Sequence, residues 1–209
     1  HLSAHDTHEE GVDTVQYLGP AAEVLVELDP PRNSDIASFL SGAQRLADCG
    51  ADAVTIADCP IGRARMDSSL LACKLRRELG IEALPHMTCR DRNVNATKAL
   101  LLGLSMEGVH NVLAVTGDPV PTDDRENVKS VFQFNSRVLA RFVKSLEQSG
   151  EADPFFLCGA LNINAANFSA ELERAKAKEK CGVEAFLTQP VLSRRAVENI
   201  RLARGVLRS

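Results

Sequence analysis

The stretch DCGADAVTIAD, residues 48–58, joins the end of an expected helix to a short apolar strand and finishes on an aspartate. Two later stretches repeat this order: EGVHNVLAVTGD at 107–118 and KCGVEAFLTQP at 180–190. Gly50, Gly108 and Gly182 are therefore predicted to adopt the left-handed backbone that closes a helix. This repeated pattern indicates a chain in which helices alternate with buried strands.

The segment before Gly50 supports this interpretation. Its apolar residues recur at the spacing of one helix face: Ile36, Phe39, Leu40, Ala43, Leu46 and Ala47. Asn33 or Ser34 is expected to cap the start of this helix. Strands are expected at 23–28, 51–57, 82–88, 110–116, 155–161 and 184–189. Helices are expected at 34–48, 66–79, 92–107, 132–148, 169–181 and 191–204.

Apolar strands that are each followed by a helix indicate a parallel sheet covered on both faces. A (β/α)8 barrel and an open doubly wound sheet both have this pattern. The barrel is favoured because no GxGxxG sequence follows the first strand. The sequence provides about six βα units, so the predicted fold is a (β/α)8 TIM barrel truncated to six units.

Polar residues stand at or just beyond the C-terminal end of five expected strands. They are Glu27, Asp58, Thr88, Asp118 and Gln189. In both architectures this edge carries the ligand site. Residues 119–135, PVPTDDRENVKSVFQFN, form a long charged loop at the same edge, where such loops are commonly functional.

Glu27 lies within VLVELDPP, residues 24–31, which is otherwise typical of a strand buried on both faces. Burying an unpaired carboxylate is costly and is commonly relieved by a raised pKa or by a partner. Glu27 is thus either an ion-paired structural residue or a general acid or base. Asp118 on the same edge provides a second carboxylate for proton transfer.

Other candidates admit two interpretations from the residues alone. His86 is either a core histidine or a ligand contact, and Lys178 either faces solvent or contacts a phosphate. Arg90 to Arg92, in PHMTCRDRN, fit a solvated loop at a helix start. Gly117 would allow a ligand to approach the backbone closely, and the amide of Gln189 would hydrogen-bond a heterocycle.

Composition excludes several classes. The 209 residues carry a formal net charge of −4, which argues against a nucleic-acid surface. No signal peptide or long apolar run occurs, so no membrane association and a cytoplasmic location are expected. The six cysteines form no CxxC pair, no HExxH occurs, and His1, His5 and His8 lie in the expected tail, so no metal is expected. Residues 1–21 are polar and aperiodic and are interpreted as a linker or tail, leaving 22–209 as the barrel domain.

Five stretches together resemble the methylenetetrahydrofolate reductase family over about residues 22–204. They are VELDPP (26–31), ADAVTIADCPIGRARM (51–66), PHMTCRDRN (85–93), VHNVLAVTGDP (109–119) and GVEAFLTQPV (182–191). The resemblance is closest to the reductase half of bacterial two-domain proteins, in which a homocysteine methyltransferase domain comes first. It implies a TIM barrel that holds FAD and reduces 5,10-methylenetetrahydrofolate to 5-methyltetrahydrofolate with NAD(P)H, in one-carbon and methionine metabolism.

The resemblance also implies roles for individual residues. Glu27 would be the acid that protonates the folate so that its methylene bridge opens to an iminium. Asp118 would lie near both flavin and pterin, where its charge tunes the flavin and stabilises a cationic intermediate. Gln189 would contact folate and nicotinamide in turn.

The remaining implied residues are flavin-binding positions. His86, Gly117 and Lys178 match the family at such positions, and Glu171 is a conservative variant of another. Thr116 and Ala57 occupy two more, where many members have Arg and Thr.

Two alternative functions stay open. One is a non-catalytic barrel remnant that binds folate or a partner domain. The other is a barrel lyase that uses Glu27 and Asp118 for proton transfer. Assembly of the chain into a homo-oligomer stays open as well.

Overall fold

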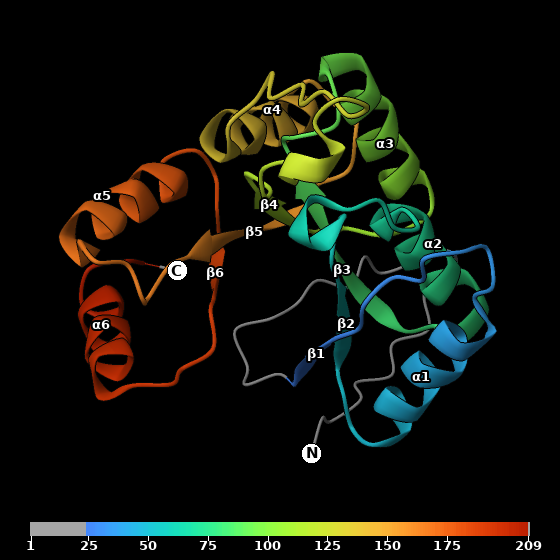
Figure 1. Cartoon of the computed structure of the whole chain (residues 1–209), viewed down its shortest axis with the longest axis horizontal. Helices are drawn as coiled ribbons and strands as arrows, with labels where there is room; N and C mark the ends of the chain where they lie inside the picture. Colours follow the sequence, from blue (N-terminus) through green and yellow to red (C-terminus); the bar gives the residue numbers. More distant parts are fainter. Residues whose placement is uncertain (1–23, 209) are drawn as a thin grey trace, which may run out of the picture.

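The computed structural model describes residues 24–208, which form a six-stranded parallel sheet curled into a half-barrel with helices on its outer face (Figure 1). Every strand pairs with its neighbour in chain order. The strands are β1 Leu25–Glu27, β2 Ala53–Ile56, β3 Glu82–Thr88, β4 Asn111–Val115, β5 Phe156–Leu161 and β6 Ala185–Thr188. The helices are α1 Ala37–Asp48, α2 Ser68–Leu79, α3 Val94–Met106, α4 Ser136–Gln148, α5 Phe168–Glu179 and α6 Arg194–Arg204. Two 3-10 turns occur as well, η1 Pro60–Gly62 and η2 Thr122–Asp124.

This architecture confirms the predicted fold class, a (β/α)8 barrel truncated to six βα units. Strict neighbour pairing brings all the strand C-termini to one edge, and each helix returns the chain to the opposite edge. The expected tail at 1–21 lies outside the described residues. None of the described helices combines the length and the apolar character needed to cross a bilayer.

The repeated glycines close helices as predicted. Gly50, Gly108 and Gly182 have φ values of 94°, 72° and 101°. After α1, the Ala51 N–H donates to the Leu46 carbonyl at 3.0 Å, a bond made at a Schellman helix end. Each glycine therefore turns the chain into the next strand.

Five of the six helices begin two to four residues later than expected. The side chains of Asn33 and Ser34 do not cap α1, whose N-cap position is Ile36. Just before the helix, Asp35 Oδ1 accepts from the Ala37 N–H at 3.0 Å. The start of α4 is moved from 132 to Ser136, because Asn135 caps its first turn. Local side-chain acceptors fix these boundaries more tightly than apolar spacing does.

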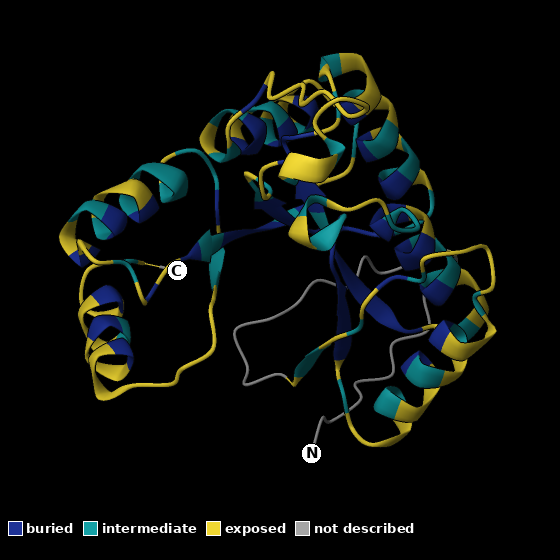
Figure 2. Ribbon diagram, in the orientation of Figure 1, coloured by how far each residue is buried: buried dark blue, intermediate teal, exposed yellow. Residues whose placement is uncertain are grey.

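Along the strands, side chains alternate between two apolar layers, one on each face of the sheet. Figure 2 shows that the middle strands are mostly buried. The outer layer packs the sheet against the helices and includes Val54, Met87 and Val112. The inner layer lies inside the half-barrel and is built on a ring of four buried residues, Ala53, Leu84, Leu113 and Cys158. Residues two positions further along each strand point to the same interior, above this ring.

The prediction that the first strand is buried on both faces is wrong. Val24 is 55% exposed, and Glu27 at the end of β1 is exposed as well. The reason is position in the sheet: within 24–208, β1 pairs with β2 alone. An edge strand lacks the neighbour that would cover its outer side.

Candidate functional site

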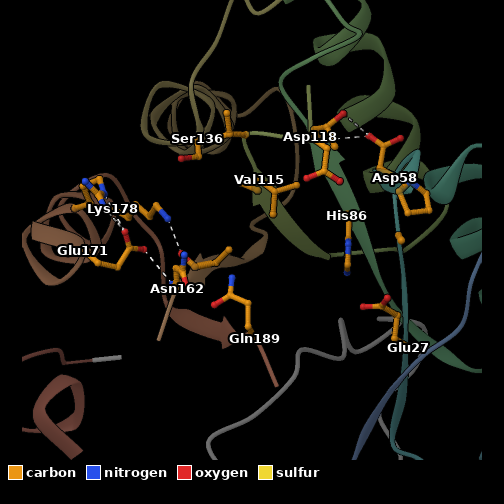
Figure 3. A pocket seen from close by; sticks show the side chains of 18 residues that line it. Glu27, Asp58, His86, Val115, Asp118, Ser136, Asn162, Glu171, Lys178 and Gln189 are labelled. Carbon is orange, nitrogen blue, oxygen red and sulfur yellow. Dashed lines mark hydrogen bonds and ion pairs between the residues drawn. The ribbon is translucent and has the colours of Figure 1, made fainter. Parts of the chain in front are cut away.

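A cavity of about 530 Å3 opens at the C-terminal edge of the sheet, above the inner apolar ring. All five polar strand-end residues line it. Its size falls within the range of small-molecule sites, about 300–1,000 Å3. Figure 3 shows its side chains converging from the strand ends and from α5.

The structure brings every candidate site residue to this one cavity. They are Glu27, Ala57, His86, Thr116, Gly117, Asp118, Glu171, Lys178 and Gln189. They derive from separate βα units and meet because the parallel strands end at the same edge. Their individual roles remain predictions.

Glu27 and His86 are linked through Thr55. Glu27 is the register partner of Thr55, whose Oγ1 lies 3.2 Å from His86 Nε2. Partial burial, with Asp29 nearby, raises the pKa of the Glu27 carboxyl. Desolvation lowers the pKa of His86 to about 4, so its imidazole is neutral at physiological pH. This wall of the cavity therefore carries a carboxyl whose pKa is raised above its ordinary value, beside an uncharged imidazole.

Asp118 is fixed by hydrogen bonds to both its side chain and its backbone. Its Oδ2 accepts from the Ile61 N–H at 3.0 Å, and its carbonyl accepts from Arg90 Nη1 at 3.0 Å. Ile61 has φ 59°, an uncommon conformation for a β-branched residue. The carboxylate is therefore positioned by a strained turn.

Gly117 permits a close approach within the protein. Its φ is 89°, and an added Cβ would lie 2.9 Å from the Cβ of Thr88. We expected the close neighbour of this glycine to be a ligand. The structure identifies Thr88 on the adjacent strand as a neighbour that already requires a glycine here.

The arginines of PHMTCRDRN are not a solvated loop, so that interpretation is wrong. Arg90 is 2% exposed. Arg92 bridges Asp58 Oδ2 at 2.7 Å and Asp67 Oδ2 at 2.6 Å. Asp58 Oδ2 also accepts from the N–H and the Oγ1 of Thr88, at 2.9 and 3.0 Å. The strand-end wall of the cavity thus carries a buried carboxylate whose Oδ2 accepts from three donors.

The opposite wall comes from β5 and α5. Lys178 is not solvent-facing: its Nζ donates to the Ala160 carbonyl at 2.5 Å, and burial lowers the pKa of its ammonium. Glu171 Oε1 accepts from the Asn162 N–H at 3.1 Å. Gln189 follows β6 and completes the lining on this side (Figure 3).

Three polar lining residues had not been predicted: Ser136, Asn162 and Arg174. Arg174 follows Glu171 by three positions and precedes Lys178 by four, a spacing that places all three on one helix face. That spacing could have identified Arg174 from the sequence. Ser136 is the first residue of α4 and Asn162 follows β5 directly, and no periodic pattern marks either position.

No group of three or more His, Cys, Asp or Glu side chains able to hold a metal ion occurs within 24–208. None of the six cysteines, all within 24–208, forms a disulfide.

Solved structures with the same fold include several α/β barrel proteins. One is 2,3-dimethylmalate lyase, a PEP mutase/isocitrate lyase superfamily member, with 12% identity and a TM-score of 0.60 over 90% of this chain and 64% of that one. Another is oxaloacetate acetylhydrolase, at 14% identity and a TM-score of 0.59 over 88% and 64%. A third is the flavin-binding domain of baker's yeast flavocytochrome b2, with 14% identity and a TM-score of 0.56 over 90% of this chain and 50% of that one. These similarities show the fold alone. This chain spans 64% of the length of each of the first two of these proteins.

Fold and cavity together define an α/β half-barrel of the TIM class with its candidate site at the C-terminal strand edge. Residues 20–195 match the family model described as methylenetetrahydrofolate reductase. The chain belongs to the methylenetetrahydrofolate reductase family.

Proposed function

We propose that this chain is the reductase domain, spanning 22–209, of a flavin-dependent enzyme that reduces 5,10-methylenetetrahydrofolate to 5-methyltetrahydrofolate with NAD(P)H. Family membership supports an oxidoreductase acting on folate. The observation that carries the finer proposal is the convergence of all nine residues implied by the resemblance on one cavity. The strand-end residues meet there by topology alone, so the most informative members are Glu171 and Lys178, which reach the same cavity from within α5.

The chemistry of the cavity lining fits FAD. Arg174 and Lys178 supply positive charge on the α5 wall, while His86 and Gln189 supply hydrogen-bonding groups without charge. These residues would hold the flavin, together with the backbone around Gly117 and the small side chains of Thr116 and Ala57. Bound FAD would supply a ring that accepts hydride from NAD(P)H and passes it to the folate.

Glu27 is the proton donor in this proposal. Its raised pKa keeps a proton available closer to neutral pH than an ordinary glutamate would. Donation to the folate opens the methylene bridge to a cationic iminium. Asp118, fixed by the Ile61 N–H, places a negative charge where it stabilises that cation. The exposed Gln189 amide would orient first one substrate and then the other.

The first experiment is an absorbance spectrum of the purified protein, before and after FAD addition and desalting. A retained flavin band that NAD(P)H bleaches and methylenetetrahydrofolate restores would support cofactor and reaction together. Glu27→Gln should then abolish folate reduction and leave NAD(P)H oxidation by the flavin largely intact. Glu198→Gln, an exposed glutamate on α6, is the matched control. If Glu27→Gln reduced methylenetetrahydrofolate at the parent rate, Glu27 would not be the proton donor.

A second candidate is a non-catalytic barrel that binds folate or a partner domain. This candidate predicts no turnover even with added FAD. A lyase using Glu27 and Asp118 would instead show activity independent of both flavin and nicotinamide.

The proposal extends to the full-length protein. From the resemblance to two-domain bacterial members, we infer a cytoplasmic protein with a homocysteine methyltransferase domain ahead of this chain. The experiment is a methyl-transfer assay from 5-methyltetrahydrofolate to homocysteine by the full-length protein. Formation of methionine would support the inference, and a full-length protein without that activity would contradict it. Sedimentation of the same protein would determine whether it is a homo-oligomer.

A further inference from the structure

Arg90 is a buried arginine that lies behind the candidate site rather than in it. It follows β3 and is 2% exposed, and it is not among the residues that line the cavity. Its Nε donates to Asp91 Oδ1 at 2.8 Å, and its Nη2 donates to Asp91 Oδ2 at 2.5 Å. This two-bond pair fixes the plane of the guanidinium. The third nitrogen, Nη1, is left to bind another residue.

Arg90 contacts both ends of one segment of the loop after β4. Its Nη1 donates to the carbonyl of Asp118 at 3.0 Å, where the segment begins. Its backbone carbonyl accepts from the Val131 N–H at 2.7 Å and from the Phe132 N–H at 3.4 Å, where the segment ends. Phe132 has φ 39°, an uncommon conformation for a bulky residue that persists only where its surroundings impose it. One residue therefore joins the start of segment 118–132 to its end.

The middle of this segment is held weakly. Beyond Val120, none of residues 121–133 is buried. Arg63 pairs with Asp123 at 2.7 Å and with Asp124 at 3.1 Å, but its side chain is 53% exposed, and such pairs contribute little to stability. A segment with few buried contacts opens at a low free energy. The bonds to the buried arginine are therefore the ones expected to keep this segment closed.

We propose that Arg90 is a positioning residue for Asp118: it clamps segment 118–132 and holds the backbone from which the Asp118 carboxylate enters the cavity. The Ile61 N–H fixes the carboxylate and Arg90 fixes the carbonyl of the same residue, so the two contacts together set where the negative charge lies. The backbone before Asp118 also packs on Arg90, since a Cβ at Gly117 would lie 3.4 Å from the Arg90 Cβ. The inference rests on the proposed function in giving Asp118 a part in folate reduction, but the clamp itself is testable without flavin.

The first experiment is limited proteolysis of the full chain with trypsin, which cleaves after Arg125 and Lys129 within the segment. Both residues are exposed. Arg90→Met should raise the rate of cleavage at these two positions about tenfold or more, because loss of a charge-assisted hydrogen bond populates the open segment. The matched control is Arg92→Met, since both carboxylate partners of Arg92 lie outside the segment. This control should be cleaved there at the parent rate.

Arg90→Lys is the second variant, and it serves if Arg90→Met does not fold. It keeps the charge beside Asp91, but one ammonium cannot repeat the two-bond pair and also reach the Asp118 carbonyl. The segment should therefore still be cleaved faster than in the parent. Arg63→Met should leave the cleavage rate close to that of the parent, and a larger effect of Arg63→Met than of either Arg90 variant would overturn the clamp.

The second experiment measures the two half-reactions of the FAD-loaded protein separately. Arg90→Met should slow reoxidation of the flavin by methylenetetrahydrofolate about tenfold or more, because misplacing a reacting group by a small distance has such an effect. Reduction of the flavin by NAD(P)H should slow less. Adding Arg90→Met to Asp118→Asn should slow the folate step little beyond Asp118→Asn alone, because Arg90 acts through Asp118. A merely structural role would make the two losses multiply.

The outcomes distinguish this inference from the proposed function. Faster cleavage together with non-additive folate rates supports both. If both Arg90 variants are cleaved at the parent rate, or if the two losses multiply, the positioning role is overturned and the reductase proposal stands. If the parent reduces no folate, the proposed function fails, and the cleavage rates alone decide whether Arg90 clamps the segment.

Discussion

Arg92→Met is the substitution that most directly tests the buried network behind the cavity. Arg92 is 15% exposed in its side chain and bridges Asp58, at 1%, and Asp67, at 28%. Without Arg92, the Asp58 carboxylate keeps its two bonds from Thr88 but has lost its ion-pair partner. Breaking a buried pair in this way costs about 3–5 kcal/mol. We expect about 3 kcal/mol, because the Thr88 donors remain and Asp67 reaches water.

The assay is urea unfolding at pH 7, with Lys98→Met as the matched control. Lys98 pairs with Glu151 at the surface, at 37% and 42% exposure, and such pairs contribute about 0–1 kcal/mol. Adding Asp58→Asn to Arg92→Met should recover part of the loss, since no buried charge then remains. If Arg92→Met lost no more stability than Lys98→Met, the network would not be the buried charge cluster described above.

Two further predictions concern the strand-end wall. Gly117→Ala should lower the free energy of unfolding by more than Gly150→Ala, measured by urea unfolding. The left-handed backbone costs each variant about 1–2 kcal/mol, but an added Cβ meets Thr88 at 2.9 Å at Gly117 and nothing within 4 Å at Gly150; equal losses would refute the contact. His86 should stay neutral down to about pH 4 in an NMR titration. Because the unfolded chain takes up this proton near pH 6.5, His86 should make stability fall as pH drops from about 6.5 towards 4; a His86 titration near 6.5 would contradict this.

The features that the sequence predicts best are those set by short-range rules. A glycine after an amphipathic helix closes it wherever it occurs, as at Gly50, Gly108 and Gly182. Polar residues at the ends of parallel strands meet because the topology leaves them no alternative. For that reason Glu27 and Asp118, far apart in the chain, were both correctly expected at one edge of the sheet.

The features that could not be predicted from the sequence depend on partners distant in the chain. Arg92 resembles a solvated helix-start residue until β2 places Asp58 beside it. The exposure of β1 follows from its place at the end of the sheet, which its apolar residues do not encode. Arg174 was within reach of the sequence, because the spacing from Glu171 to Lys178 already marks the helix face that carries it.

The third apolar cluster has a consequence for local stability. It joins β5, α5 and α6 and is built on Leu161, Ile163, Phe168, Ala175, Ala196 and Ala203, apart from the main core. Segments with their own small core tend to open as separate cooperative units. The last two βα units should therefore exchange their amide hydrogens sooner than β2 to β4. Since Glu171, Arg174 and Lys178 of α5 line the cavity, a ligand bound there should slow that exchange most in the region that otherwise opens first.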